Sequence, residues 1–197
     1  MRLLVVFAHP STESFGYALF TRTVNTLESL GHEVQALDLY RLGFDPVLST
    51  EEWHSYLTDT DRNIEQVQDH VDKLLWAEGL VFVFPTFFFG LPAVLKGWFE
   101  RVWLPGVTFE TAVSRNRRTV PKMKHIRLIT VITTSGSPRW WIWMIRDPVR
   151  SFFKRGIRPL FARRCRYIWC QLYNMNHVDR DEGSDFLNRV EQRLRTI

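Results

Sequence analysis

The chain has 197 residues, of which 45% are hydrophobic and 24% are charged, and its net charge is +5. These totals suit one globular domain over residues 1–197 and exclude a disordered or fibrous chain. No apolar run is long enough to cross a bilayer, and the first apolar run follows no signal-type leader. Cys165 and Cys170 match neither a disulfide framework nor a zinc pattern, so we expect buried thiols in a cytoplasmic protein with no metal site.

Five apolar runs alternate with stretches of helical spacing along the chain. The runs fall at residues 3–8, 33–39, 80–84, 126–133 and 166–172, and helical patterns at 15–30, 64–76, 93–103, 140–164 and 181–196. Residues 45–61 and 104–124 have few periodic cues and are expected to be loops, the first with a helical turn. Strands that alternate with helices predict parallel βαβ units with right-handed crossovers. We therefore expect an α/β fold with three layers around a doubly wound, flavodoxin-like five-stranded parallel sheet, in the order 2-1-3-4-5.

Charge is divided unevenly between the two halves of the chain. Residues 1–100 carry 6 basic and 14 acidic side chains, whereas residues 101–197 carry 20 basic and 7 acidic ones. Between Arg139 and Arg166 there are nine Lys or Arg residues and one Asp. Such a basic half can attract nucleic acid, anionic lipid or an anionic cofactor, or it can be a solvated face with no partner.

Three loops should meet at one edge of the predicted sheet, because the order 2-1-3-4-5 makes the carboxyl ends of strands one, three and four neighbours. Residues 9–15 are rich in hydroxyl groups and precede a helix, whose N-terminus favours phosphate. Residues 85–90 present three aromatic rings, and residues 133–137 are small and polar. Together they predict a flavin nucleotide site. Each loop alone also has a plain structural interpretation as a helix cap or a covered core. Neither GxGxxG after the first strand nor GxxxxGK[ST] occurs, which argues against a dinucleotide-binding Rossmann domain and an NTPase.

Three stretches of the sequence resemble the NAD(P)H:quinone oxidoreductase family. They are AHPSTESFGYAL at residues 8–19, DLYRLGFDPVLS at 38–49 and FPTFFFGLPAVLKGWFERVW at 84–103, and the similarity extends from residue 1 to about 136. The family includes a regulatory subunit of bacterial potassium-efflux systems. The resemblance implies a flavodoxin-like homodimer that binds FAD, or FMN in some members, and transfers hydride from NAD(P)H to quinones.

The resemblance also implies roles for individual residues. Those expected at the flavin are His9, Ser14, Phe15 and Gly16 for the phosphate end, Thr86, Phe87, Phe88 and Phe89 for the ring, and Thr133, Thr134, Ser135 and Gly136 for its pyrimidine edge. From their positions in the loops, we also expect Ser11 to add a donor at the phosphate end and Pro85 to lie at the site. Phe87 and Phe88 stand where well-known members have Gln and Trp, so the surface on which the flavin ring would stack is more apolar here. Phe88 is our candidate for the catalytic position on this surface. Phe109, Glu110 and Trp140 are weaker candidates for the walls of the acceptor site.

The sequence departs from the family after Gly136. Well-known members have a Tyr and a His there, and this chain has Pro138, Arg139, Trp140 and Trp141. We expect Arg139 to take the catalytic, electrostatic role, because a cation near the flavin stabilises negative charge on its reduced form.

The basic aromatic segment at residues 140–164 has three interpretations: a crossover helix packed on the sheet, a dimer contact, or a peripheral contact with a membrane. The leading functional prediction is an NAD(P)H-dependent flavin oxidoreductase acting on quinones, with no nucleic-acid partner. The alternatives are a regulatory subunit beside a potassium-efflux transporter and a flavodoxin-type electron carrier. We rank the carrier last, because carriers are usually acidic around the flavin and this chain is basic.

Overall fold

Five parallel strands form the central sheet. The computed structural model describes residues 1–111 and 119–197, and its main sheet has the order β2-β1-β3-β6-β7. The strands are β1 Arg2–Phe7, β2 Glu33–Asp38, β3 Gly79–Pro85, β6 Leu128–Thr134 and β7 Arg166–Leu172. Because β6 and β7 are the fourth and fifth strands of this sheet, the predicted order 2-1-3-4-5 and the flavodoxin-like fold are confirmed.

Burial follows the position of each strand in the sheet. Residues 3–7 of β1, residues 79–84 of β3 and all of β6 are buried, which explains their continuous apolar runs. The edge strands β2 and β7 are mostly half-buried or exposed. The three strands that carry the predicted loops therefore lie in the rigid middle of the sheet.

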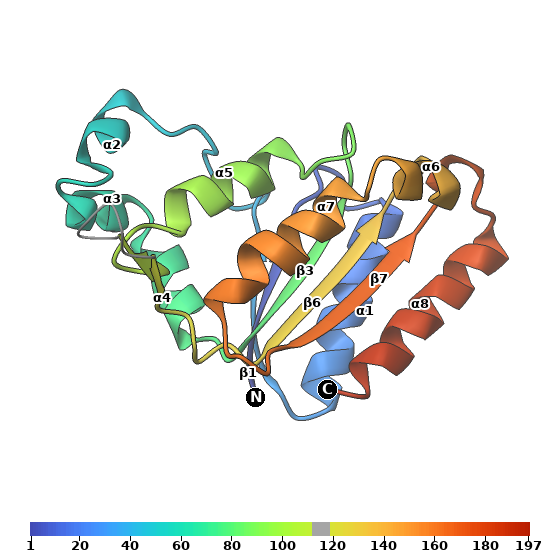
Figure 1. Cartoon of the computed structure of the whole chain (residues 1–197). Helices are drawn as coiled ribbons and strands as arrows, with labels where there is room; N and C mark the ends of the chain where they lie inside the picture. Colours follow the sequence, from blue (N-terminus) through green and yellow to red (C-terminus); the bar gives the residue numbers. More distant parts are fainter. Residues whose placement is uncertain (112–118) are drawn as a thin grey trace.

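Helices cover both faces of the sheet (Figure 1). Helices α1 Phe15–Ser29 and α8 Arg180–Leu194 pack together on one face. On the other face lie α4 Gln68–Trp76, α5 Ala93–Val102, α7 Pro148–Ser151 and a π-helical turn η1 at Phe152–Ile157. Gly31, with φ of 78°, ends α1 in the left-handed conformation, and the His32 N–H donates to the Leu27 carbonyl at 3.2 Å, as the sequence predicts for a helix C-terminus.

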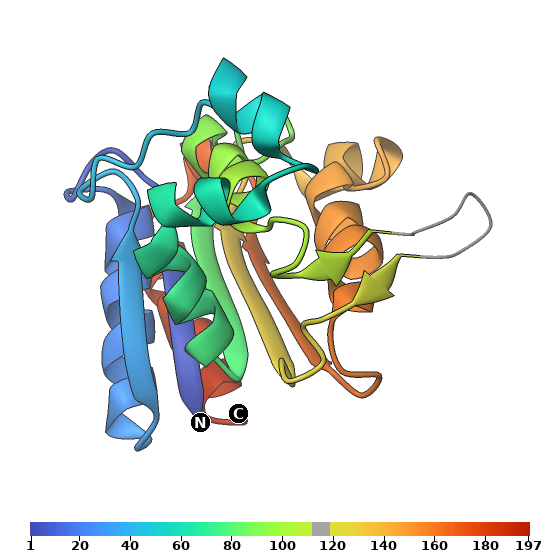
Figure 2. The same cartoon turned by 90° about the vertical axis from the view of Figure 1, so that its left-hand side faces the viewer.

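Two segments are more structured than we expected. Residues 45–61 contain a complete helix, α2 Thr50–Ser55, and the start of α3 Thr60–Gln66. The helix predicted over residues 64–76 is therefore two helices, α3 and α4, interrupted at Val67. In the stretch 104–124, β4 Phe109–Glu110 and β5 Val120–Pro121 pair in an antiparallel arm (Figure 2). The rest of that predicted loop, residues 112–118, lies outside the described residues.

The basic aromatic segment is a series of short helical turns. Helix α6 Arg139–Met144 is followed by α7, by η1 and by a 3-10 turn η2 at Arg158–Leu160. Arg146 and Asp147 separate α6 from α7 with φ of 63° and 43°, so the break precedes Pro148, which begins α7. A further 3-10 turn, η3 Met175–His177, lies between β7 and α8.

None of the helices in the described part of the chain has both the length and the apolar character that crossing a bilayer requires. Both cysteines are free; Cys165 is buried, and burial raises the pKa of its thiol to about 11.

Candidate functional site

A cavity of about 390 Å³ lies at the carboxyl ends of β1, β3 and β6. The three predicted loops meet there, and the loop after β7 joins them. The cavity is lined by His9, Ser14, Phe15, Gly16, Pro85, Thr86, Phe87, Thr134, Gly136, Met175 and Asn176. Its volume falls in the lower part of the range of about 300–1,000 Å³ typical of small-molecule pockets.

The loop after β1 is held by its own hydrogen bonds. The Ser11 N–H donates to Nδ1 of His9 at 3.0 Å. The Ser11 carbonyl oxygen also lies 3.1 Å from this nitrogen. The same carbonyl accepts a hydrogen bond from the Ser14 hydroxyl at 2.8 Å. Because a backbone N–H can only donate, the bond from Ser11 assigns Nδ1 of His9 as the acceptor and leaves Nε2 as the ring nitrogen that can donate to a ligand.

The first turn of α1 offers free donors to this cavity. Ser14 is the N-cap: its side-chain oxygen accepts the Tyr17 N–H at 3.1 Å. The N–H groups of Phe15 and Gly16 precede the first intrahelical bonds of α1 and have no acceptor among residues 1–111 and 119–197. Because the helix dipole adds partial positive charge at this end, the turn favours a phosphate group. The Ser14 hydroxyl is occupied by the cap, so the backbone supplies the free donors here.

The aromatic loop after β3 is a tight two-residue turn. Phe87 and Gly90 exchange two backbone hydrogen bonds, of 3.1 and 2.8 Å, around Phe88 and Phe89. Those two residues have φ of 46° and 59°, a left-handed conformation that costs a non-glycine residue on the order of 1–3 kcal/mol. Phe87 lines the cavity, whereas Phe88 is fully exposed at 102% and does not. Only part of the predicted aromatic platform therefore faces the cavity directly.

The loops after β3 and β6 are locked together by Thr86. Its N–H and its hydroxyl both donate to the Thr134 carbonyl, at 2.8 and 3.1 Å. Thr133 and Ser135 are buried behind the lining, and the Ser135 N–H donates to the Leu172 carbonyl at 2.8 Å. Thr133 and Ser135 therefore support the cavity wall from behind, while Thr134 and Gly136 form its surface.

Met175 and Asn176 are lining residues that we did not predict. The Met175 N–H donates to the Ser135 carbonyl at 2.9 Å, which draws η3 onto the loop after β6. A Cβ added at Gly136 would lie 3.2 Å from Nδ2 of Asn176, so the two residues are in close approach. The predicted strand order could have indicated them, because strand five lies beside strand four and the loop after strand five therefore begins at the same edge of the sheet.

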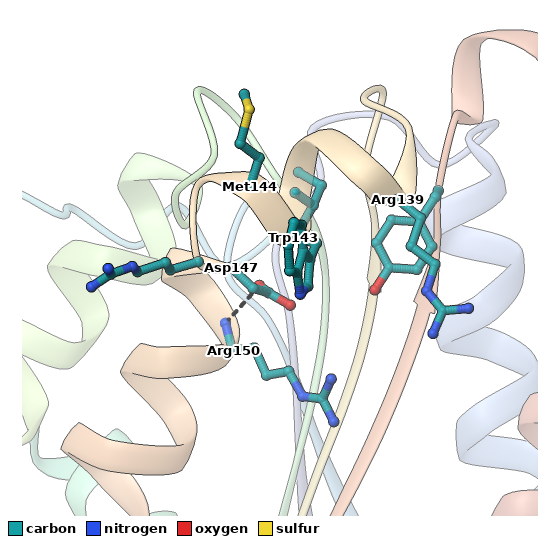
Figure 3. Close-up of a pocket in the computed structure, with 8 residues that line it drawn as sticks. Arg139, Trp143, Met144, Asp147 and Arg150 are labelled. Atoms are coloured by element: carbon teal, nitrogen blue, oxygen red, sulfur yellow. Dashed lines mark hydrogen bonds between the residues drawn. The ribbon is translucent and has the colours of Figure 1, made fainter.

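Of the residues predicted at the flavin, Ser11, Phe88, Phe89, Thr133 and Ser135 do not line this cavity, and neither do Arg139 and the three residues predicted for the acceptor site. Phe109 and Glu110 lie in the β4–β5 arm, where Glu110 pairs with Lys122 at 2.9 Å. Trp140 is 63% exposed on α6. Arg139, at the start of α6, lines a second cavity of about 480 Å³ (Figure 3). Among residues 1–111 and 119–197 no group of three or more His, Cys, Asp or Glu is placed to hold a metal ion.

Comparison with known proteins places this geometry in context. A family described as having a flavodoxin-like fold matches residues 1–144. The NAD(P)H dehydrogenase (quinone) 1 of Rattus norvegicus is 32% identical over 227 residues, which cover 100% of this chain and 77% of the rat protein. The chain spans about half the length of several other curated relatives it matches, from 45% to 54%.

Solved structures share the fold along the whole chain. The Smu.1420 protein of Streptococcus mutans UA159 superposes with a TM-score of 0.87 at 26% identity, over 100% of both chains. An FMN-dependent NADH-azoreductase from Bacillus anthracis str. Ames Ancestor, in complex with FMN, superposes with a TM-score of 0.76 at 18% identity, over 99% of this chain and 98% of the other.

Proposed function

The chain belongs to the NAD(P)H:quinone oxidoreductase family of flavodoxin-like enzymes, and we propose that it uses a bound flavin to transfer hydride from NAD(P)H to quinones or similar acceptors. The family resemblance expected from the sequence is confirmed. The flavin, the two substrates and the roles of individual residues are parts of the proposal.

The observation that carries the proposal is the arrangement of the first cavity. It combines phosphate donors in the first turn of α1 with an apolar wall from Pro85 and Phe87 and a small polar rim at Thr134 and Gly136. A flavin nucleotide has a phosphate at one end and a flat ring at the other. The residues present therefore fit the group that the family implies.

The flavin would be held at both ends. We assign its phosphate to the N–H groups of Phe15 and Gly16 and to Nε2–H of His9, with Ser11 and Ser14 fixing the loop. We assign its ring to the space between Phe87 and Thr134. A bound flavin supplies two-electron hydride chemistry, so the chain needs no side-chain nucleophile. FAD is the cofactor that the resemblance implies, and FMN, which the azoreductase binds, is the alternative.

The protein's own contribution is to align the substrates and to exclude water. The locked Thr86–Thr134 contact fixes the wall against which a flat ring would stack. NAD(P)H and the acceptor would occupy the same open side of the cavity in turn.

Arg139 lines the second cavity and not the first. We therefore propose that its positive charge acts on the flavin from the cavity beside the flavin site. Removing this cation should make the reduced, anionic flavin less stable, so Arg139→Ala should shift the flavin potential to a more negative value. An unchanged potential together with unchanged turnover contradicts this role.

The homodimer, the cytoplasmic location and a peripheral membrane contact remain predictions. The exposed tryptophans of α6, Trp140 at 63% and Trp143 at 80%, offer apolar surface for a partner. Light scattering in solution measures the mass of the assembly, and flotation with anionic liposomes at low salt tests membrane contact.

One experiment tests the proposed function as a whole. The purified protein should be yellow and should oxidise NADH or NADPH when a soluble quinone is added. Mass spectrometry of the released nucleotide then distinguishes FAD from FMN. A yellow protein that oxidises neither nucleotide, or a colourless protein that takes up no flavin, would refute the proposal.

A further inference from the structure

The second cavity, of about 480 Å³, lies between α6, α7 and the end of β7 (Figure 3). It shares no lining residue with the first cavity. The left-handed residues Arg146 and Asp147 create it, because they turn the chain sharply between α6 and α7. The Asp147 carboxylate accepts the Arg150 N–H at 3.1 Å and caps α7.

The cavity is strongly cationic. Arg139, Arg146 and Arg150 all line it, and none of them forms an ion pair with a carboxylate in the described part of the chain. Asp147 is the one acidic lining residue. Burial raises the pKa of its carboxyl group, and the hydrogen bond from the Arg150 N–H and the Arg150 charge partly oppose this rise. Guanidinium groups bind phosphate through paired N–H donors, so this cluster is suited to a multiply charged anion.

The cavity also has an aromatic surface. The Trp143 side chain, 80% exposed, lies between Arg139 and Asp147 in the view of Figure 3. Tyr173 is a further lining residue, and the Arg150 guanidinium lies 5.9 Å from the centre of the Trp169 ring. An exposed indole beside arginines offers a flat ligand both a stacking face and charge.

The two cavities are close neighbours. Gly136 lines the first and Arg139 the second, so their Cα atoms are at most about 11 Å apart. A second, shorter stretch of chain also joins the two cavities, because Tyr173 lines the second and Met175 lines the first. Asn174 lies between these two residues in the sequence, and its N–H donates to the Ser137 carbonyl at 3.0 Å. A ligand with two ends can therefore reach both cavities at once.

We propose that the second cavity binds the adenosine 2′-phosphate end of NADPH, with the phosphate on Arg139 and Arg150 and the adenine on Trp143. The inference rests on the proposed function, because the nicotinamide end would then lie at the first cavity. NADH lacks the 2′-phosphate, which carries charge that these arginines can bind. The chain should therefore use NADPH in preference to NADH.

Binding of nucleotide fragments tests the site without turnover. The purified protein is titrated by calorimetry with 2′,5′-ADP and with 5′-AMP, which differ only in the 2′-phosphate. We expect 2′,5′-ADP to bind at least tenfold more tightly. Arg139→Gln and Arg150→Gln should each weaken 2′,5′-ADP about tenfold and leave 5′-AMP nearly unchanged.

Two further variants separate the site from general charge and from misfolding. Arg155→Gln removes the same charge from an exposed position of η1 outside the cavity and should leave binding unchanged. Asp147→Asn keeps a capping side chain but removes the negative charge, so 2′,5′-ADP should bind more tightly, a gain that misfolding cannot produce. Equal affinity for the two nucleotides, or equal weakening by Arg155→Gln, would overturn the proposal.

Turnover distinguishes this inference from the proposed function. The ratio of kcat/KM for NADPH to that for NADH should exceed ten and fall toward one in Arg139→Gln. A flavoprotein that oxidises both nucleotides equally well refutes the inference alone. A protein that binds 2′,5′-ADP as expected but oxidises neither nucleotide supports the site and refutes the proposed function.

Discussion

Ser14 has two separable roles in this structure, and two substitutions can distinguish them. Its hydroxyl caps α1 through the Tyr17 N–H at 3.1 Å and donates to the Ser11 carbonyl at 2.8 Å. Ser14→Ala removes both bonds. Loss of a cap costs about 1 kcal/mol, and loss of a further hydrogen bond about 1 kcal/mol. The free energy of unfolding should fall by about 2 kcal/mol, or roughly 4–8 °C in Tm for a chain of this size.

Ser14→Asp should weaken flavin binding and cost less stability than Ser14→Ala, because it keeps the cap and loses only the hydrogen bond to the Ser11 carbonyl, about 1 kcal/mol. Aspartate caps a helix as well as serine does, and its charge is favourable at the N-terminus. The same carboxylate would lie beside the proposed flavin phosphate. Two such charges about 4 Å apart repel by about 1–4 kcal/mol for effective dielectric constants of about 80–20. Flavin affinity should therefore fall by about five-fold to several hundred-fold.

Two measurements on the flavin-free protein decide the matter: thermal unfolding followed by circular dichroism, and flavin titration followed by fluorescence quenching. Ser29→Asp is the matched control, because it places the same charge at the other end of α1 and should leave flavin affinity unchanged. If Ser14→Asp keeps the folded circular dichroism spectrum and binds flavin as tightly as the unmodified protein, no phosphate binds at this turn.

Two further predictions concern stability. Gly97→Ala should lower the free energy of unfolding by about 1–3 kcal/mol in denaturant titration, because the added Cβ would overlap the Pro46 carbonyl. Gly156→Ala, with open space around it, should not destabilise. Arg101 and Glu52 form a nearly buried ion pair at 2.7 Å. Burial alone would raise the pKa of the Glu52 carboxyl group. The hydrogen bonds from Ser49 and Arg101 have the larger combined effect and hold this pKa below its ordinary value of 4.5. The stabilisation from the pair is therefore complete above about pH 4.5 and is lost as the pH falls through the lower folded pKa. Glu52→Gln should flatten acid unfolding over that range, and an unchanged acid profile would contradict this account.

The central sheet could be predicted because its three middle strands are buried on both faces. The runs at β1, β3 and β6 are continuous in apolar residues, and the prolines and glycines around them mark clear ends. The order of parallel strands then brought His9, Phe87 and Thr134 to one cavity, as predicted.

The features that the sequence did not reveal depend on backbone geometry or on very short elements. Val67 and Val71 keep helical spacing across the break between α3 and α4, so the pattern hides it. The two-residue strands of the β4–β5 arm are too short to show alternation. Phe88 and Phe89 adopt left-handed angles that few aromatic residues take, which turns the Phe88 ring out to solvent.

The positions of Arg139 and Asn176 depend on how loops turn after the strands end. Arg139 is three residues beyond Gly136, but the start of α6 directs it into the second cavity. Asn176 reaches the first cavity because backbone bonds draw η3 onto the loop after β6. Such placements follow from hydrogen bonds between loops, which residue patterns do not record.

The absorbance spectrum of the purified protein, recorded without oxygen before and after NADPH is added, tests the central claim most directly. We predict flavin absorbance bands that bleach on addition of NADPH and return when a quinone is supplied. A spectrum without flavin bands, even after incubation with FAD and FMN, or bands that NADPH and NADH leave unchanged, would contradict the account.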